Sequence, residues 1–177
     1  MHEIRNPRSS RNRRAKLNSP PKGEPFVWMT ARMLVSHAYR KLSGNALKVL
    51  SRVMFEHTAH AGTMNGKLIV THANFEEYGI RRASISEAIR QCEYMGFLSV
   101  ERGHFYKGGN ESNVYRLTIL PSHDGKPATN EWKSIGMTHI EAFDAKKQAQ
   151  IQHVAARRAV RRATKPTGNI VPIRSRP

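Results

Sequence analysis

Apolar positions recur at helical spacing through residues 43–62. Four positions fall on one face of that segment: Leu47, Leu50, Met54 and His57. This spacing predicts an amphipathic helix that packs one face on a core, with Ser43 or Asn45 as its cap and Gly62 as its end. The stretch before it, TARMLVSHAYRKL at 30–42, predicts one shorter helix on the same core.

Two further elements follow within a few residues. GKLIV at 66–70 comes after an Asn-Gly pair and predicts a short strand. Thr71 is then placed to cap a two-turn helix, HANFEEY, which Gly79 ends. The chain therefore enters its next helix through a tight turn at Gly79 and Ile80.

The helix after this turn has two contrasting faces. Ser84 and Glu87, three residues apart, predict a capping box at its start. The face expected to be buried carries Ile85, Ala88, Ile89 and Cys92. The opposite face carries short or polar groups able to enter a groove: Ser84, Ser86, Glu87, Arg90, Gln91 and Tyr94.

Alternation with period two begins after Gly96. FLSVER at 97–102 and NVYRLTI at 113–119 predict two strands, joined by a long loop, GHFYKGGNES. Two helices joined by a tight turn and followed by such a hairpin indicate a winged helix-turn-helix. We therefore expect an α+β fold over residues 25–120, with three to four helices and a small antiparallel sheet.

Positive charge is concentrated at the two ends of the chain. The formal net charge is +17 and the pI is about 10.8. Residues 1–24 hold seven Lys/Arg against two acidic residues, residues 144–177 hold nine against one, and the middle holds 14 against 10. Such an excess attracts a phosphate backbone. Residues 1–24 lack an apolar period and are expected to form a disordered basic arm.

The C-terminal part predicts a basic helix between two irregular segments. Residues 121–137 are expected to be a linker and residues 166–177 a disordered basic tail. Thr138 and Glu141 predict a capping box at the start of a helix over 138–165. Four arginines recur in pairs four residues apart and form a basic face that would repel itself unless it met phosphate: Arg157, Arg158, Arg161 and Arg162.

Other kinds of chemistry find little support in the sequence. Lone Cys92 cannot form an internal disulfide or a thiolate zinc cage. His57, His60 and His72 lack a carboxylate or thiolate at ligand spacing, so we expect no metal. No nucleophile is paired with a base and no P-loop is present, so we expect neither an enzyme nor a cofactor. Without a long apolar run or a signal h-region, the protein is expected to be cytoplasmic, with no membrane partner.

The order of these elements resembles a known family. LSGNALKVLSRV, THANFEEYGIRRASISEAIRQCEYMGFLSV and NVYRLTI follow one another as in the winged-helix domains of phage and plasmid replication proteins, such as the amino-terminal domain of lambda-type replication protein O. The chain is similar also to helix-turn-helix proteins of alphaproteobacterial genomes and their mobile elements. The resemblance covers residues 26–120 and implies a second helix, Arg81 to Gln91, in the major groove of DNA, with a wing near Lys107.

The candidate DNA contacts are spread over the helix-turn-helix, the wing and the C-terminal helix. They are Thr71, Arg81, Arg82, Ser84, Ser86, Arg90, Gln91, Arg102, Lys107, Arg157, Arg158, Arg161 and Arg162. Arg81 and Arg82 are alternatively a solvated helix start, although cations at the positive end of a helix are mildly unfavourable without an anion nearby. Arg90 is alternatively a surface partner of Glu87 or Glu93, and Lys107 a mobile loop residue.

These patterns together predict a protein that binds double-stranded DNA. The helix after Gly79 would read the major groove, and the wing would contact phosphates or the minor groove. A transcriptional regulator, associated with a bacterial or phage nucleoid, is the first expectation, and a replication-origin binder of a phage, plasmid or mobile element is the second. An RNA-binding or ribosome-associated protein is the alternative from another class. A homodimer and contacts with the replication or transcription machinery stay open.

Overall fold

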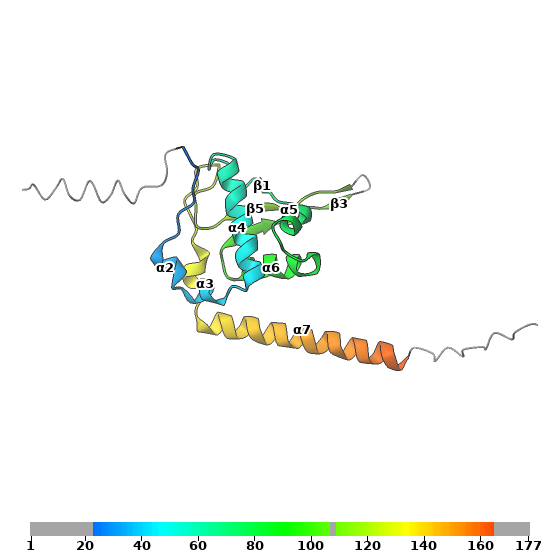
Figure 1. Cartoon of the computed structure of the whole chain (residues 1–177). Coiled ribbons are helices and arrows are strands. Elements are labelled where there is room, and N and C mark those ends of the chain that lie inside the picture. The colour runs from blue at the N-terminus through cyan, green and yellow to red at the C-terminus, as the bar shows by residue number, and fades with distance from the viewer. Residues whose placement is uncertain (1–22, 107–108, 165–177) are drawn as a thin grey trace, which may run out of the picture. The chain divides into compact units, whose positions relative to one another are not determined.

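The computed structural model describes residues 23–106 and 109–164 of the 177-residue chain. The basic arm predicted for residues 1–24 lies almost entirely outside the described residues, and the tail predicted for 166–177 lies wholly outside them. The chain divides into two units, one ending at Ile135 and the other beginning at Gly136. Figure 1 shows the elements of each unit.

Three helices open the first unit: α2 (Ala31–Leu34), α3 (His37–Lys41) and α4 (Gly44–Ala59). The single helix expected over 30–42 is therefore two short helices. Ser36 causes the break, because its hydroxyl accepts the Tyr39 backbone N–H at 3.1 Å and donates to the Met33 carbonyl at 2.6 Å. Ser43 rather than Asn45 caps α4, where it accepts the Ala46 backbone N–H. Leu50 and His57 on α4 are buried, while Leu47 and Met54 are only half-buried.

Helices α5 (His72–Glu77) and α6 (Arg82–Tyr94) are joined by a tight turn. Thr71 caps α5, and Gly79 has a φ of 81° in the turn, both as predicted. The capping box predicted at Ser84 and Glu87 is wrong, because α6 begins at Arg82 with Arg81 as its N-cap and no side-chain cap. Buried Ile80 fixes the chain immediately before Arg81, so the helix begins three residues earlier than a cap at Ser84 predicts.

An antiparallel three-stranded sheet follows the order β1-β5-β2, with β1 at Leu68–Ile69, β2 at Leu98–Glu101 and β5 at Val114–Leu117. Leu98 pairs with Leu117, and Leu68 pairs with Tyr115. The segment predicted as one long loop contains a hairpin of two short strands, β3 (Phe105–Tyr106) and β4 (Gly109–Asn110). This α+β arrangement is compatible with the predicted winged helix.

Aromatic rings occupy the centre of the first unit. The buried Phe75 and Tyr115 rings meet edge to face with centroids 6.0 Å apart, and Tyr39 contacts Phe97 in the same way. On its other flank, Phe97 stacks on Trp132 with centroids 6.3 Å apart and planes only 9° from parallel. These contacts join α5, the sheet and the segment that follows it into one core.

Residues 121–135, predicted as part of a linker, belong instead to the first unit. A short 3-10 helix, η1 (Glu131–Ser134), carries Trp132 into the core. Asn65 is buried and fixes the start of this segment, because its amide nitrogen donates to the Leu117, Leu120 and Pro121 carbonyls at 2.9 to 3.1 Å. The polar composition of residues 121–130 did not indicate that the segment packs on the first unit. This packing depends on one buried asparagine and one tryptophan.

The second unit is a single long helix in the described residues, α7 (Met137–Ala163). It begins after Gly136, so the predicted capping box at Thr138 and Glu141 is wrong by position; the Gly136 backbone N–H instead donates to the His139 Nδ1 at 3.4 Å. Every side chain from 145 to 161 is exposed. No helix in the described part of the chain is both long and apolar enough to cross a membrane.

Candidate nucleic-acid interface

Helix α6 buries one face and leaves the adjoining face open. The predicted buried residues Ile85, Ala88, Ile89 and Cys92 are all at most 2% exposed. At about 100° per residue, Arg82, Ser86 and Arg90 fall within roughly 80° of arc on the exposed face. All three are exposed, as is Arg81, whereas Ser84 is half-buried. The N-terminal half of α6 therefore presents arginines and a small hydroxyl to solvent.

Gln91 was predicted to contact DNA, and the structure contradicts this. Its side chain is buried, and its Oε1 accepts the Ser43 backbone N–H at 3.2 Å and the Ser43 hydroxyl at 2.7 Å. Its Nε2 donates to the Lys41 carbonyl at 3.1 Å. Because the junction between α3 and α4 covers that flank of α6, Gln91 bonds to polar groups of Lys41 and Ser43 there and is buried away from a base.

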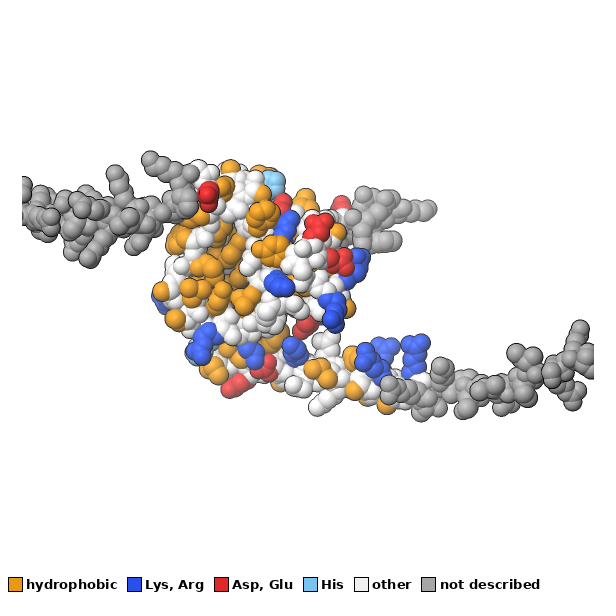
Figure 2. All heavy atoms as spheres, in the orientation of Figure 1, with side chains coloured by type: hydrophobic (Ala, Val, Ile, Leu, Met, Phe, Trp, Pro, Cys, Tyr) orange, Lys and Arg blue, Asp and Glu red, His pale blue; other side chains and the backbone are white. Residues whose placement is uncertain are grey.

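Most arginines around α6 are paired with acidic side chains. Arg82 contacts Glu76 of α5 at 3.1 Å, and Arg90 contacts Glu87 at 2.8 Å, the pairing left open by the sequence. Arg102 follows β2 and pairs with Glu93. The Arg81 side chain makes no hydrogen bond or ion pair with another described residue. Figure 2 shows this alternation of basic and acidic side chains on the side of the first unit that carries α5 and α6.

A polar groove lies between the start of α5, the start of α6 and the base of the β3–β4 hairpin. We call it the hairpin groove, and its volume is about 300 Å³. Its lining residues are Val70, Thr71, His72, Arg82, Gly103, Glu111, Ser112 and Asn113. Hydroxyl, amide, imidazole and guanidinium groups converge here, so the groove offers several hydrogen-bond donors together with one carboxylate.

Thr71 lines the hairpin groove but has a structural role as well. Its hydroxyl accepts the Asn74 backbone N–H at 3.2 Å and donates to the Asn74 Oδ1 at 2.9 Å. Both directions of the hydroxyl are thereby used in capping α5. A lone pair remains for a donor, but the hydroxyl proton is not free for a phosphate oxygen.

Lys48 is a basic residue beside the turn that the sequence prediction missed. Its Nζ donates to the Gly79 carbonyl at 2.9 Å, and a Cβ added at Gly79 would lie 3.2 Å from that nitrogen. Lys48 therefore places a cation from α4 next to the start of α6. Its exposed position on an amphipathic helix was visible in the sequence, but its proximity to Gly79 depends on how α4 packs against the turn.

The remaining predicted contacts lie on the hairpin and on α7. Lys107 lies outside the described residues. Arg157, Arg158 and Arg161 are exposed on α7, and the side chain of Arg162 is not among those described. The basic face of α7 belongs to the second unit, and that of α6 belongs to the first.

Two features of the described residues bear on bond-making chemistry. Burial raises the pKa of the Cys92 thiol to about 12, so the thiolate needed for a nucleophile is not formed near neutral pH. Among the residues that the structure describes, no group of three or more His, Cys, Asp or Glu side chains is placed to hold a metal ion.

Comparison with protein-family models, with curated proteins and with solved structures finds no match to this chain.

Proposed function

We propose that the chain binds double-stranded DNA and that α5, the turn at Gly79 and α6 act as a helix-turn-helix. The observation that carries the proposal is the division of α6 into a fully buried face and a face on which Arg81, Arg82, Ser86 and Arg90 are exposed. An α-helix fits the major groove, where arginine recognises guanine and serine can form hydrogen bonds with more than one kind of base. In such a motif the N-terminal residues of the second helix contact base edges.

The β3–β4 hairpin would act as the wing of this domain. The hairpin groove lies between it and the start of α6, so a DNA strand held at α6 would pass the donors of His72, Ser112 and Asn113. Polar side chains of this kind contact phosphate and sugar oxygens and fix the orientation of a protein on the duplex. Lys48, beside the turn, adds a cation at the same end of α6.

The ion pairs around α6 determine where the binding free energy comes from. Exposed pairs such as Arg82–Glu76 are worth only about 0 to 1 kcal/mol, so a phosphate or a base can replace the carboxylate at small cost. The acidic partners nevertheless cancel most of the local positive field. We therefore assign sequence preference to α6 and most of the affinity to the ends of the chain, which hold 16 of the 30 Lys/Arg residues.

Two biological roles fit this arrangement. We propose a transcriptional regulator of the nucleoid first, and an origin-binding replication initiator of a phage, plasmid or mobile element second. Both require sequence-specific recognition of duplex DNA and both would act in the cytoplasm of a bacterium.

One observation favours a second function, RNA binding through the ends of the chain. Arg157, Arg158 and Arg161 of α7 are exposed, whereas three arginines around α6 are paired with carboxylates: Arg82, Arg90 and Arg102. Arginine-rich segments bind RNA through phosphate contacts and stacking. In that case the first unit would be a scaffold and α6 an ordinary charged surface helix.

A selection experiment with the full chain separates the two functions. Duplexes that bind the protein are selected from a pool of random DNA sequences. The affinity of the protein is then measured for the selected duplex, a scrambled duplex and duplex RNA. The double variant Arg81→Ala, Arg82→Ala should lose about 1 to 3 kcal/mol on the selected duplex and much less on the scrambled one. Arg40→Ala, which removes an exposed arginine of α3, is the matched control.

The outcome that contradicts DNA recognition is equally distinct. If no duplex sequence is enriched and RNA competes better than DNA, the RNA function replaces the first proposal. Replacing Arg157, Arg158 and Arg161 with Gln should flatten the log–log salt dependence by about 0.9 for each phosphate that the variant no longer neutralises. The preference for the selected duplex should remain, because counterion release is independent of sequence.

A further inference from the structure

A second groove lies in the first unit, away from the hairpin. We call it the tryptophan groove; its volume is about 410 Å³. It is lined by Trp28, Thr30, Arg32, Met33, Ile119, Pro121, Ala128, Asn130, Trp132 and Lys133. In Figure 1, α2 and η1, which contribute to it, lie on the side of α4 away from α5 and the β3–β4 hairpin. The groove is therefore distinct from the proposed DNA surface.

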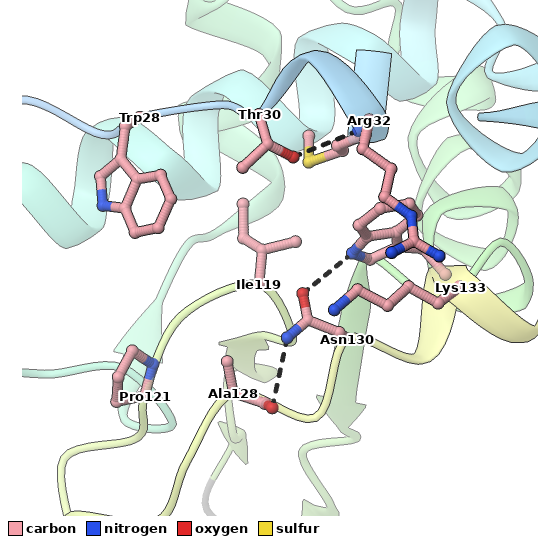
Figure 3. Close-up of a pocket in the computed structure, with 10 residues that line it drawn as sticks. Trp28, Thr30, Arg32, Ile119, Pro121, Ala128, Asn130 and Lys133 are labelled. Atoms are coloured by element: carbon pink, nitrogen blue, oxygen red, sulfur yellow. Dashed lines mark hydrogen bonds between the residues drawn. The ribbon is translucent and has the colours of Figure 1, made fainter. Parts of the chain in front are cut away.

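The floor of the tryptophan groove is apolar and held in place. Trp132 is buried, and its indole N–H donates to the Asn130 Oδ1 at 3.1 Å. The Asn130 amide in turn donates to the Ala128 carbonyl at 3.3 Å, as Figure 3 shows. These hydrogen bonds hold Trp132 and Asn130 in place, so the groove is already formed without an occupant.

One edge of the groove exposes large apolar side chains to water. Trp28 is 63% exposed, and Phe26 and Val35, in the same N-terminal part of the unit, are 59% and 70% exposed. Figure 2 shows hydrophobic side chains gathered on the side of the first unit where Figure 1 places its N-terminal segment and α2. An apolar surface of this kind next to a formed groove marks a protein interaction site rather than a small-molecule pocket.

Two cations lie at the groove without a carboxylate. Arg32 and Lys133 both line it, the Lys133 Nζ lies 5.7 Å from the centre of the Trp132 ring, and the lining contains no acidic residue. Neither cation forms an ion pair with another described residue. Their charges would be matched by an acidic occupant. A second copy of this chain is a poor fit, because its net charge is also +17.

The floor of the tryptophan groove favours an acidic protein over a nucleic acid as the occupant. Binding of single strands depends on bases stacking on open aromatic faces. Trp132 offers no open face, because Phe97 stacks on one side and Lys133 approaches the ring. The apolar residues Ile119, Pro121 and Met33 also line the groove and suit a bulky apolar side chain.

We propose that the tryptophan groove binds an acidic segment of a partner protein, with a bulky apolar side chain of that segment between Trp28 and Trp132 and its carboxylates on Arg32 and Lys133. This proposal goes beyond DNA binding and does not depend on it. It would allow the protein to hold a second macromolecule on a face that the duplex leaves free.

The two tryptophans give a direct readout, because they are the only ones in the chain and both line the groove. The full chain, labelled with ¹⁵N, is titrated with a blocked peptide that alternates Glu with Leu and Phe, and the two indole N–H signals are followed by NMR. Three probes serve as controls: the same peptide with Ser for Leu and Phe, the same peptide with Gln for Glu, and oligothymidylate.

The expected result is a saturable shift of both indole signals at peptide concentrations below about 1 mM. The serine peptide should still bind the basic ends but leave the indoles unmoved, and the glutamine peptide should bind far more weakly. Trp28→Ala and Arg32→Gln should each weaken binding about tenfold, the second mainly at low salt. Phe55→Ala and Arg40→Gln remove an exposed aromatic ring and an exposed cation outside the groove and should change nothing.

Three outcomes would overturn the proposal. No saturable indole shift would exclude a peptide site, and an equal shift with the serine peptide would reduce the effect to charge alone. A larger shift with oligothymidylate would assign the groove to nucleic acid instead. Each outcome is independent of the duplex selection, so failure here leaves the proposed DNA binding untouched.

Discussion

Replacing Gln91 with Ala tests whether this residue of α6 is structural. The variant removes three hydrogen bonds that join α6 to the junction of α3 and α4, two from Ser43 and one to the Lys41 carbonyl. At about 1 kcal/mol for each bond, the free energy of unfolding should fall by about 3 kcal/mol. For a unit of this size that corresponds to a drop of roughly 10 °C in Tm.

Thermal unfolding followed by circular dichroism measures this change in stability. Duplex binding, measured at a temperature where the variant is folded, shows whether Gln91 also contacts DNA. Affinity for the selected duplex should stay within about twofold of the parent, because Gln91 is only 5% exposed. Arg90→Ala, at the neighbouring exposed position, should leave the Tm nearly unchanged, since its pair with Glu87 is exposed. An unchanged Tm together with weaker DNA binding for Gln91→Ala would refute the structural role.

Three further changes test the packing of the first unit. Ile89→Asp should destabilise it by several kcal/mol, because an unpaired carboxylate would face the core; a parent-like denaturant midpoint would mean that this face of α6 is not buried. Gly96→Ala should cost about 1 to 3 kcal/mol, since Gly96 has a φ of 73° and an added Cβ would lie 2.6 Å from the Trp132 backbone nitrogen; Gly125→Ala, which also has a positive φ but open space around it, is the control for the clash. Burial lowers the pKa of His57 below its ordinary value of 6.5, so the unfolded chain binds the proton more readily than the folded chain. The stability that His57 contributes above about pH 6.5 should therefore be lost as the pH falls. His57→Gln should reduce the dependence of the free energy of unfolding on pH, and an identical dependence in parent and variant would contradict this role.

Local signals along the chain predicted the main elements well. Thr71 and Gly79 act through side-chain capping and backbone conformation within a few residues, so their roles were visible from sequence spacing alone. The buried face of α6 was equally predictable, because Ile85, Ala88, Ile89 and Cys92 repeat with the period of a helix. The sheet followed from the alternation around Leu98 and Leu117.

The differences arise where distant segments meet. Gln91 is polar and lies at the border between the two faces of α6. The helical period therefore does not show that it contacts Ser43 and Lys41, which are about 50 residues away in the sequence. The segment 121–135 looked like a linker because its packing depends on Trp132 against Phe97 and on Asn65, contacts that have no repeating pattern. The ion pair between Arg82 and Glu76 likewise required the turn geometry.

The helix register at α6 shows how a strong local motif can mislead. Ser84 and Glu87 have the spacing of a capping box, yet the Ser84 backbone N–H already donates to the Arg81 carbonyl at 2.8 Å. The buried Ile80 fixes the chain before Arg81, and this tertiary contact takes precedence over the local cap preference.

If the N-terminal half of α6 lies against the bases of a duplex, as proposed, a cleaving label on that half of the helix should cut the DNA next to it. Ser86→Cys introduces an exposed thiol on the proposed contact face, while native Cys92 is buried with a pKa of about 12 and should resist labelling. With an iron chelate attached at position 86, cutting should be confined to a few adjacent nucleotides at a fixed place in the selected duplex. The same label at Ser134→Cys, on η1, should leave the duplex intact. Absence of cutting from position 86, or scattered cutting that is equal from both positions, would contradict the placement of α6 against the bases.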